Sequence, residues 1–319
     1  MTIEKAARPT LTAFELDAGD ELHFTLIDGT VRRVKLLETR AGIWTSNLEQ
    51  VGAPGPQAKV VLKMYCRLEI DGHRVEINRW VGNQQSFYEP WVLFGMRLWF
   101  DACAELFNHV KEEHGKCRPR RRARFAVQDA RLGICPVLLH PWCPLPEGGL
   151  HIEDCYEGSD CWLGPYFGVD AHGGLDINHP AGTPIWTPVA IDDHGYFDSL
   201  AAGANNNRWR GSRAWPDGSR WILQVHHLIR LHVPEGQPLD AGTHLADGAG
   251  VLSGSHEHSH FVFGVVEPGD DDEAKILLDP WILFWQMYCD RSRTAAAPNP
   301  GNPRSPRSPR SRQGPGAPC

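Results

Sequence analysis

Residues 172–188 read HGGLDINHPAGTPIWTP, and residues 255–263 read SHEHSHFVF. The first stretch offers His172 and Asp176 as metal ligands, and the second offers His260 as a third. Three such ligands leave one position of a tetrahedral zinc ion open, which is typical of catalytic rather than structural zinc sites. Mixed imidazole and carboxylate ligands also suit zinc. The two stretches therefore predict a zinc site that is divided between distant parts of the chain.

The residues around these ligands predict their local structure. Gly173 and Gly174 predict a tight turn between the first two ligands, and residues 180–188 predict a turn followed by a strand. The histidines at 256, 258 and 260 alternate, so a strand would present all three on one face. In that arrangement His258 stands beside His260 and can carry a proton.

The segment from His256 to His260 also matches the zincin pattern, in which two histidines flank a glutamate general base on a helix. Glycine and serine precede this segment, and β-branched and aromatic residues follow it, which favours a strand. We therefore interpret the zincin match as a coincidence, and substitution of Glu257 tests that interpretation.

Four ordered segments within residues 164–266 carry a family resemblance. They are His-x-x-x-Asp with Pro-x-Gly-Thr-Pro, WILQVHHLIR at 221–230, VPEGQPLDAG at 233–242, and His-x-His-Phe. In this order they resemble the lysostaphin-like (LytM-type) zinc metallopeptidases, which cut peptidoglycan peptides. The chain departs from the family pattern in lacking a Gly-Pro loop before His-x-His and in having Val262 after the Phe.

The resemblance implies a function and a set of site residues. It implies Zn²⁺ held by His172, Asp176 and His260, with His258 as general base and His227 as a second active-site histidine. Period 2 places His226 on the opposite strand face from His227. We interpret His179, His194, His232 and His244 as core or surface residues.

Two functions follow for this chain. The first is a zinc-dependent metalloendopeptidase acting on peptide bonds, with peptidoglycan cross-links as the substrate that the resemblance implies. The alternative is a catalytically silent LytM-like binding or scaffold module. No signal peptide or membrane span is evident in the sequence, whereas the resemblance implies action outside the cytoplasm.

The N-terminal part of the chain is predicted to be mostly extended. Asp-Gly pairs at 28–29 and 71–72 interrupt alternating segments and predict two hairpins. Pro90 and Pro280 introduce the similar stretches EPWVLF and DPWILF, which predict a helix from about residue 91 toward Val110 and another from Trp281.

These patterns predict a mainly β chain with few helices. Its parts are an N-terminal small β domain with one helix (11–125), a Cys/Pro-rich linker (126–163), a LytM-like peptidase domain (164–290) and a disordered Pro/Arg/Ser tail (291–319). The resemblance implies a duplicated β-hybrid or barrel-like core for the peptidase domain.

Net charge and cysteine content limit the classes of binding partner that the chain can have. The net charge of −7 over 319 residues argues against a general nucleic-acid binder. Of the nine cysteines, four crowd the linker at 135, 143, 155 and 161, where disulfides or a second metal site both remain open. A peptide substrate is the expected partner, and the sequence sets no oligomeric state.

Overall fold

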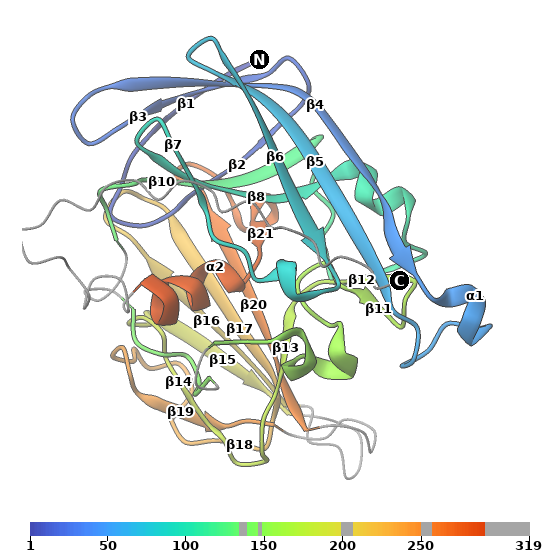
Figure 1. The fold of residues 1–319 in the computed structure, drawn as a ribbon. Helices are drawn as coiled ribbons and strands as arrows, with labels where there is room; N and C mark the ends of the chain where they lie inside the picture. Colours follow the sequence, from blue (N-terminus) through green and yellow to red (C-terminus); the bar gives the residue numbers. More distant parts are fainter. Residues whose placement is uncertain (134–138, 146–148, 199–206, 250–256, 291–319) are drawn as a thin grey trace, which may run out of the picture.

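A computed structural model describes residues 1–133, 139–145, 149–198, 207–249 and 257–290 (Figure 1). The chain is mainly β, as its sequence predicts. The tail at 291–319 lies outside the described residues, as do His256 and Cys135. Within the described residues, no helix has the length and apolar character that crossing a membrane would require.

Two antiparallel sheets dominate the N-terminal half, with β1 added in parallel at one edge. The first sheet has the order β1-β3-β4-β5-β6, and the second has the order β2-β10-β8-β7. Their strands are β1 (Thr2–Ala6), β2 (Thr12–Leu16), β3 (Glu21–Thr25), β4 (Val31–Ser46), β5 (Val60–Ile70), β6 (His73–Val81), β7 (Trp91–Leu93), β8 (Met96–Cys103) and β10 (Ala123–Asp129).

Both predicted hairpins are confirmed. The Asp28-Gly29 turn joins β3 to β4, and the Asp71-Gly72 turn joins β5 to β6. Asp71 and Gly72 have φ values of 49° and 82°. Positive φ at both central residues is the geometry of the two-residue hairpin turn that Asp-Gly favours.

The helix predicted from residue 91 toward Val110 is wrong. This segment forms the β7–β8 hairpin, followed by a short 3₁₀ helix at Ala104–Asn108. Phe94 and Gly95 form its turn with φ values of 52° and 83°. Gly95 accepts the left-handed conformation without a steric penalty, so cross-strand pairing prevails over a Pro90 helix start.

The C-terminal half is built around a sheet with the order β13-β20-β17-β16-β15, in which β21 also pairs with β20. Smaller sheets have the orders β14-β19-β18 and β11-β12-β9. These strands are β9 (Glu113–His114), β11 (Pro165–Tyr166), β12 (Asp170–His172), β13 (Leu175–Asn178), β14 (Pro184–Trp186), β15 (Asp193–Phe197), β16 (Asn207–Ala214), β17 (Arg220–Leu228), β18 (Arg230–Leu231), β19 (His244–Asp247), β20 (His258–Val266) and β21 (Ile276–Leu278).

The helices are short. The α-helices are α1 (Leu48–Val51) and α2 (Trp281–Phe284), and α2 continues as a π-helix over Trp285–Asp290. The predicted helix start at Trp281 is therefore confirmed. Other 3₁₀ turns are Gln84–Ser86, Ile152–Asp154, Tyr156–Gly158 and Asp272–Ala274.

Helix α2 covers one face of the β20 sheet (Figure 1). Phe261 of β20 meets the rings of Trp142 and Phe284 edge to face, at centroid separations of 5.1 and 5.2 Å. Since side chains alternate along a strand, His258 and His260 point to the other face. Packing on the α2 side therefore leaves the histidine side of β20 for a cleft.

A buried charge network joins the two halves of the chain. Arg79 of β6 contacts the Asp279 carboxylate and donates to the Asp101 carbonyl. Arg124 of β10 donates from Nε to Asp101 Oδ2 at 2.5 Å, and the Asp279 backbone N–H donates to Asp101 Oδ1 at 2.8 Å. Asp279 also accepts from the Trp281 N–H at the start of α2. All four groups are buried. Burial raises the pKa of Asp279 to about 7, and the adjacent Arg79 opposes that rise, so the network places opposite charges side by side.

Six cysteines are buried free thiols within the described part of the chain, and among them are three of the four that crowd the predicted linker, Cys143, Cys155 and Cys161. Burial raises the pKa of Cys161 to about 11. Such thiols are protonated and unreactive at neutral pH. The described linker cysteines thus act here as small buried side chains.

We predict that Arg79→Met lowers the free energy of unfolding by about 3–5 kcal/mol, because it leaves the buried Asp279 carboxylate without its cationic partner, whereas Asp101 keeps Arg124. Chemical denaturation of the purified variant measures this loss. The matched control is Arg40→Met, whose exposed ion pair with Glu38 contributes at most about 1 kcal/mol. Equal effects of the two substitutions would contradict a structural role for the network.

Candidate active site

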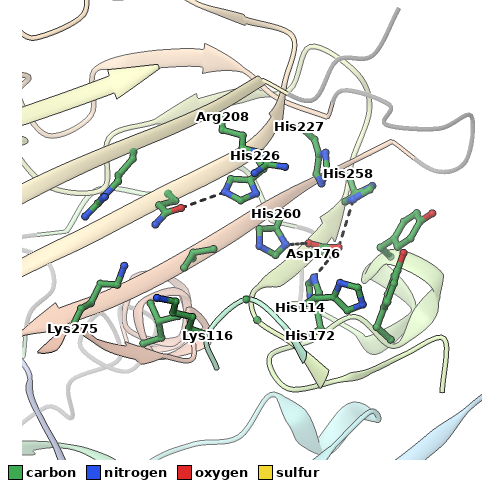
Figure 2. A pocket seen from close by; sticks show the side chains of 18 of the residues that line it. His114, Lys116, His172, Asp176, Arg208, His226, His227, His258, His260 and Lys275 are labelled. Atoms are coloured by element: carbon green, nitrogen blue, oxygen red, sulfur yellow. Dashed lines mark hydrogen bonds and ion pairs between the residues drawn. The ribbon is translucent and has the colours of Figure 1, made fainter. Parts of the chain in front are cut away.

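A cleft of about 730 Å³ lies on the face of the β20 sheet opposite α2. All five residues singled out from the sequence line it: His172, Asp176, His227, His258 and His260. Figure 2 shows the histidines gathered around Asp176. The structure thus brings together residues that lie up to 88 positions apart, from His172 to His260.

Asp176 lies at the centre of the cluster. Its Oδ1 is 2.7 Å from Nδ1 of His260, and its Oδ2 is 3.4 Å from Nε2 of His172. Antiparallel pairing of β13 with β20 sets Asp176 directly opposite His260. One donor atom from each of the three residues lies within 4.8 Å of the others. Donors about 2.0–2.2 Å from a tetrahedral ion lie roughly 3.3–3.6 Å from one another, so small shifts of these side chains would let the three residues hold zinc.

Gly173 and Gly174, between His172 and Asp176, are needed because a side chain would not fit there. Neither glycine has a positive φ. A Cβ on Gly174 would lie 2.2 Å from Cε1 of His260, and a Cβ on Gly173 would lie 2.2 Å from the His114 carbonyl oxygen. Neither distance is compatible with a side chain. The Gly-Gly pair therefore allows a ligand ring on one side and β9 on the other to approach the β12–β13 connection.

Burial keeps the two candidate ligand histidines neutral. It lowers the pKa of His172 to about 4 and the pKa of His260 to about 3, and the other nearby histidines contribute to both shifts. Neutral imidazole has the free lone pair that a metal requires. At neutral pH the two rings are therefore ready to bind a divalent cation beside the Asp176 carboxylate.

His258 and His227 form a second layer beside the candidate ligands. Nε2 of His258 lies 3.6 Å from Asp176 Oδ2, and its ring stacks on Tyr156 at a centroid separation of 4.3 Å. The His227 ring lies 4.5 Å from that of His258. Burial lowers the pKa of His227 to about 3, so this ring is neutral at pH 7. A neutral imidazole can donate a hydrogen bond to a substrate oxygen.

The expectation that His226 faces away from His227 is wrong, because both residues line the cleft. The β16–β17 register shifts between Asn207 and Trp209, where β17 has an extra residue, and His227 has a φ of 60°. Such a β-bulge interrupts strict alternation and re-aims side chains. His226 stacks on His260 at 4.7 Å. The adjacent histidines were visible in the sequence, but the bulge that turns both inward was not.

The zincin interpretation requires a helix, and His258–Val266 is instead a strand. Glu257 is directed toward the 180–183 turn, where its Oε2 accepts a hydrogen bond from the Ala181 N–H. The strand prediction for this segment is confirmed.

Two further cleft residues had no signal in the sequence. Tyr156, from a 3₁₀ turn in the predicted linker, supplies the ring under His258. His114 reaches the cleft because β9 pairs in parallel with β12, and its Nε2 lies 3.3 Å from Asp170 Oδ2. Both depend on contacts between distant segments, which no local pattern encodes.

A second histidine group lies on the surface at His232, His244 and Asp247, again with one donor atom each within 4.8 Å. His232 donates from Nε2 to Asp247 Oδ1 at 2.8 Å, and Arg230 donates from Nε to Oδ2 at 2.9 Å. Ion pairs with Asp247 explain why these side chains lie close together. This exposed group therefore serves as a control for metal binding by the buried group of His172, Asp176 and His260.

Comparison with known proteins gives weak matches only. No protein-family model matches the chain, and no curated protein does. Among solved structures, the antimicrobial peptidase lysostaphin from Staphylococcus simulans is similar at 18% identity over 51% of this chain and 54% of that one, with a TM-score of 0.26. The chain spans about half the length of the full lysostaphin structures that it matches.

Two other structures overlap more of the chain. An M23 peptidase from Pseudomonas aeruginosa shares 13% identity over 88% of this chain and 96% of that one, with a TM-score of 0.31. A zinc-containing peptidase from Vibrio cholerae shares 12% identity over 82% and 83%, with a TM-score of 0.23. These similarities are low, so the functional proposal below rests on the residues of this chain.

We predict that Gly174→Ala lowers zinc content from about one ion per chain to well below half, because the added methyl displaces His260 from an open three-ligand site. Elemental mass spectrometry of the dialysed protein measures this. Gly42→Ala is the control, since its Cβ would meet no atom within 4 Å. Full zinc content in Gly174→Ala would contradict the close approach of His260.

Proposed function

We propose that the chain is a zinc-dependent metalloendopeptidase, with His172, Asp176 and His260 as zinc ligands, His258 as general base and His227 as oxyanion stabiliser. One observation carries the proposal: three candidate ligands and two further histidines converge on the Asp176 side of one open cleft. The family resemblance adds peptidoglycan cross-links as the substrate and a location outside the cytoplasm. We also propose that residues 164–290 form the peptidase domain and 11–125 the N-terminal β domain.

Bound zinc would polarise the scissile carbonyl and acidify water. His258 takes up the proton of the attacking water at Nε2, which faces Asp176, and returns it to the leaving amine. Stacking on Tyr156 fixes the plane of the His258 ring during this transfer. The neutral His227 ring donates its N–H to the oxygen that becomes negative as the peptide bond is attacked.

We predict that Asp176→Ala removes the zinc, because the carboxylate is the ligand opposite His260 and beside His172. Elemental mass spectrometry should find about one zinc per chain in the wild type and close to none in the variant. Asp247→Ala is the matched control, since it removes the same carboxylate from the exposed histidine group. Zinc that is lost in Asp247→Ala and retained in Asp176→Ala would overturn the ligand assignment.

We predict that His258→Ala reduces turnover of purified peptidoglycan by about 10²-fold or more while zinc content stays near one, because general-base catalysis contributes on this scale. Release of soluble peptidoglycan fragments measures turnover. Glu257→Ala, one residue away, should leave turnover intact. Unchanged turnover in His258→Ala would refute the assignment of the base, and a zinc-loaded wild type without activity would favour the silent binding module.

A further inference from the structure

The cleft continues beyond the histidines to an end that is lined by basic side chains. Lys116, Arg208, Arg210 and Lys275 all line it. Figure 2 shows Lys116 and Lys275 together at the end away from His227 and His258. The proposed chemistry uses none of these four residues.

Strand register places these groups relative to the candidate ligands. Asp176, His260 and His226 are direct cross-strand partners and form one row across the sheet. Two residues further along, Val262, Gln224 and Arg210 form the next row. Another two residues along β20 comes Gly264, where an added Cβ would meet the Lys275 side chain at 3.0 Å. The aliphatic part of the Lys275 side chain therefore lies over Gly264, four residues along β20 from His260.

This separation corresponds to a short stretch of peptide. A strand rises about 3.3 Å per residue, so four residues span roughly 13 Å. Consider a substrate that lies extended along β20 with its scissile bond at His260. Its side chain about three or four residues from that bond would reach Lys275.

The charges at this end are not balanced. Asp272 contacts Arg220 and lies 3.8 Å from Arg210, so its carboxylate is already paired. Within the described residues, the side chains of Lys116, Arg208 and Lys275 make no hydrogen bond or ion pair. Glu273 is the one remaining acidic side chain on the described wall at this end of the cleft. Burial lowers the pKa of Lys275, and the neighbouring Arg210 and Lys116 lower it further. An incoming anion would relieve this repulsion.

We propose that Lys275 and Lys116 form an anion subsite that selects peptides carrying a carboxylate three or four residues from the scissile bond. The peptidase function proposed above places the peptide in the cleft, and the subsite rests on that function. Arg208 lies beside His226, at the row formed by Asp176, His260 and His226 (Figure 2). Its charge steers the same anionic peptide into the cleft.

Binding tests the subsite without requiring turnover. The probes are fluorescein-labelled octapeptides of glycine and alanine with one Glu placed three or four residues to either side of the centre, each with a Gln twin. Further pairs end in a free carboxylate or an amide, which distinguishes a side-chain carboxylate from a chain terminus. Fluorescence anisotropy with zinc-loaded His258→Ala protein measures affinity while leaving the peptide intact.

We predict that at least one Glu or free-carboxylate peptide binds about tenfold more tightly than its neutral twin, and that 0.5 M NaCl reduces this ratio. Lys275→Met in the same background should bring the ratio close to one, and Lys275→Arg should keep most of it. Lys35→Met, on the N-terminal sheet, is the control and should leave the ratio unchanged. Equal affinities within every pair, or no measurable binding of any peptide, would overturn the subsite.

Cleavage separates this proposal from the one on which it rests. Charge-selective binding that depends on Lys275, without cleavage by the wild-type protein, would support the subsite and refute the peptidase. Cleavage of Glu and Gln twins at equal rates by the wild type would support the peptidase and refute the subsite.

Discussion

The buried charges of Arg79, Asp101, Arg124 and Asp279 are the interaction on which the arrangement of the sheets depends. Removing such groups from water is costly unless every charge finds its partner, so the network tolerates little displacement of the strands that supply it. β6, β8 and β10 supply the first three charges, and the residue after β21 supplies the fourth. Since β21 pairs with β20, the network also positions the strand that carries His258 and His260.

A second ionic contact holds the C-terminal end of β20. Glu267, which follows β20, is buried and accepts hydrogen bonds from Arg8 at 2.6 Å, Lys5 at 3.0 Å and the Ala13 N–H at 2.8 Å. The N-terminal segment is therefore fastened to the end of β20. A rigid central strand is what a catalytic or metal site needs, because small errors in ligand position are costly to both.

Local backbone irregularity then completes the cleft. The β17 bulge turns His226 and His227 to the same side, with His227 in the left-handed region that non-glycine residues enter at a cost of about 1 kcal/mol or more. Gly174 leaves space for the His260 ring. Beyond this neutral histidine cluster, the cleft wall becomes basic, so one groove presents two chemically different regions along a single strand direction.

The sequence by itself determined the elements whose signals are local. The Asp-Gly hairpins, the helix start at Trp281, the strand at His258–Val266 and the two short segments that carry the candidate ligands follow from residue type and spacing over a few positions. The tertiary structure alone decided the rest. It made residues 91–103 a hairpin through cross-strand pairing, turned His226 inward through a bulge, and brought Tyr156, His114 and Lys275 to the cleft. Those outcomes depend on contacts between segments far apart in the chain, and spacing along a sequence does not record which distant strand will become a neighbour.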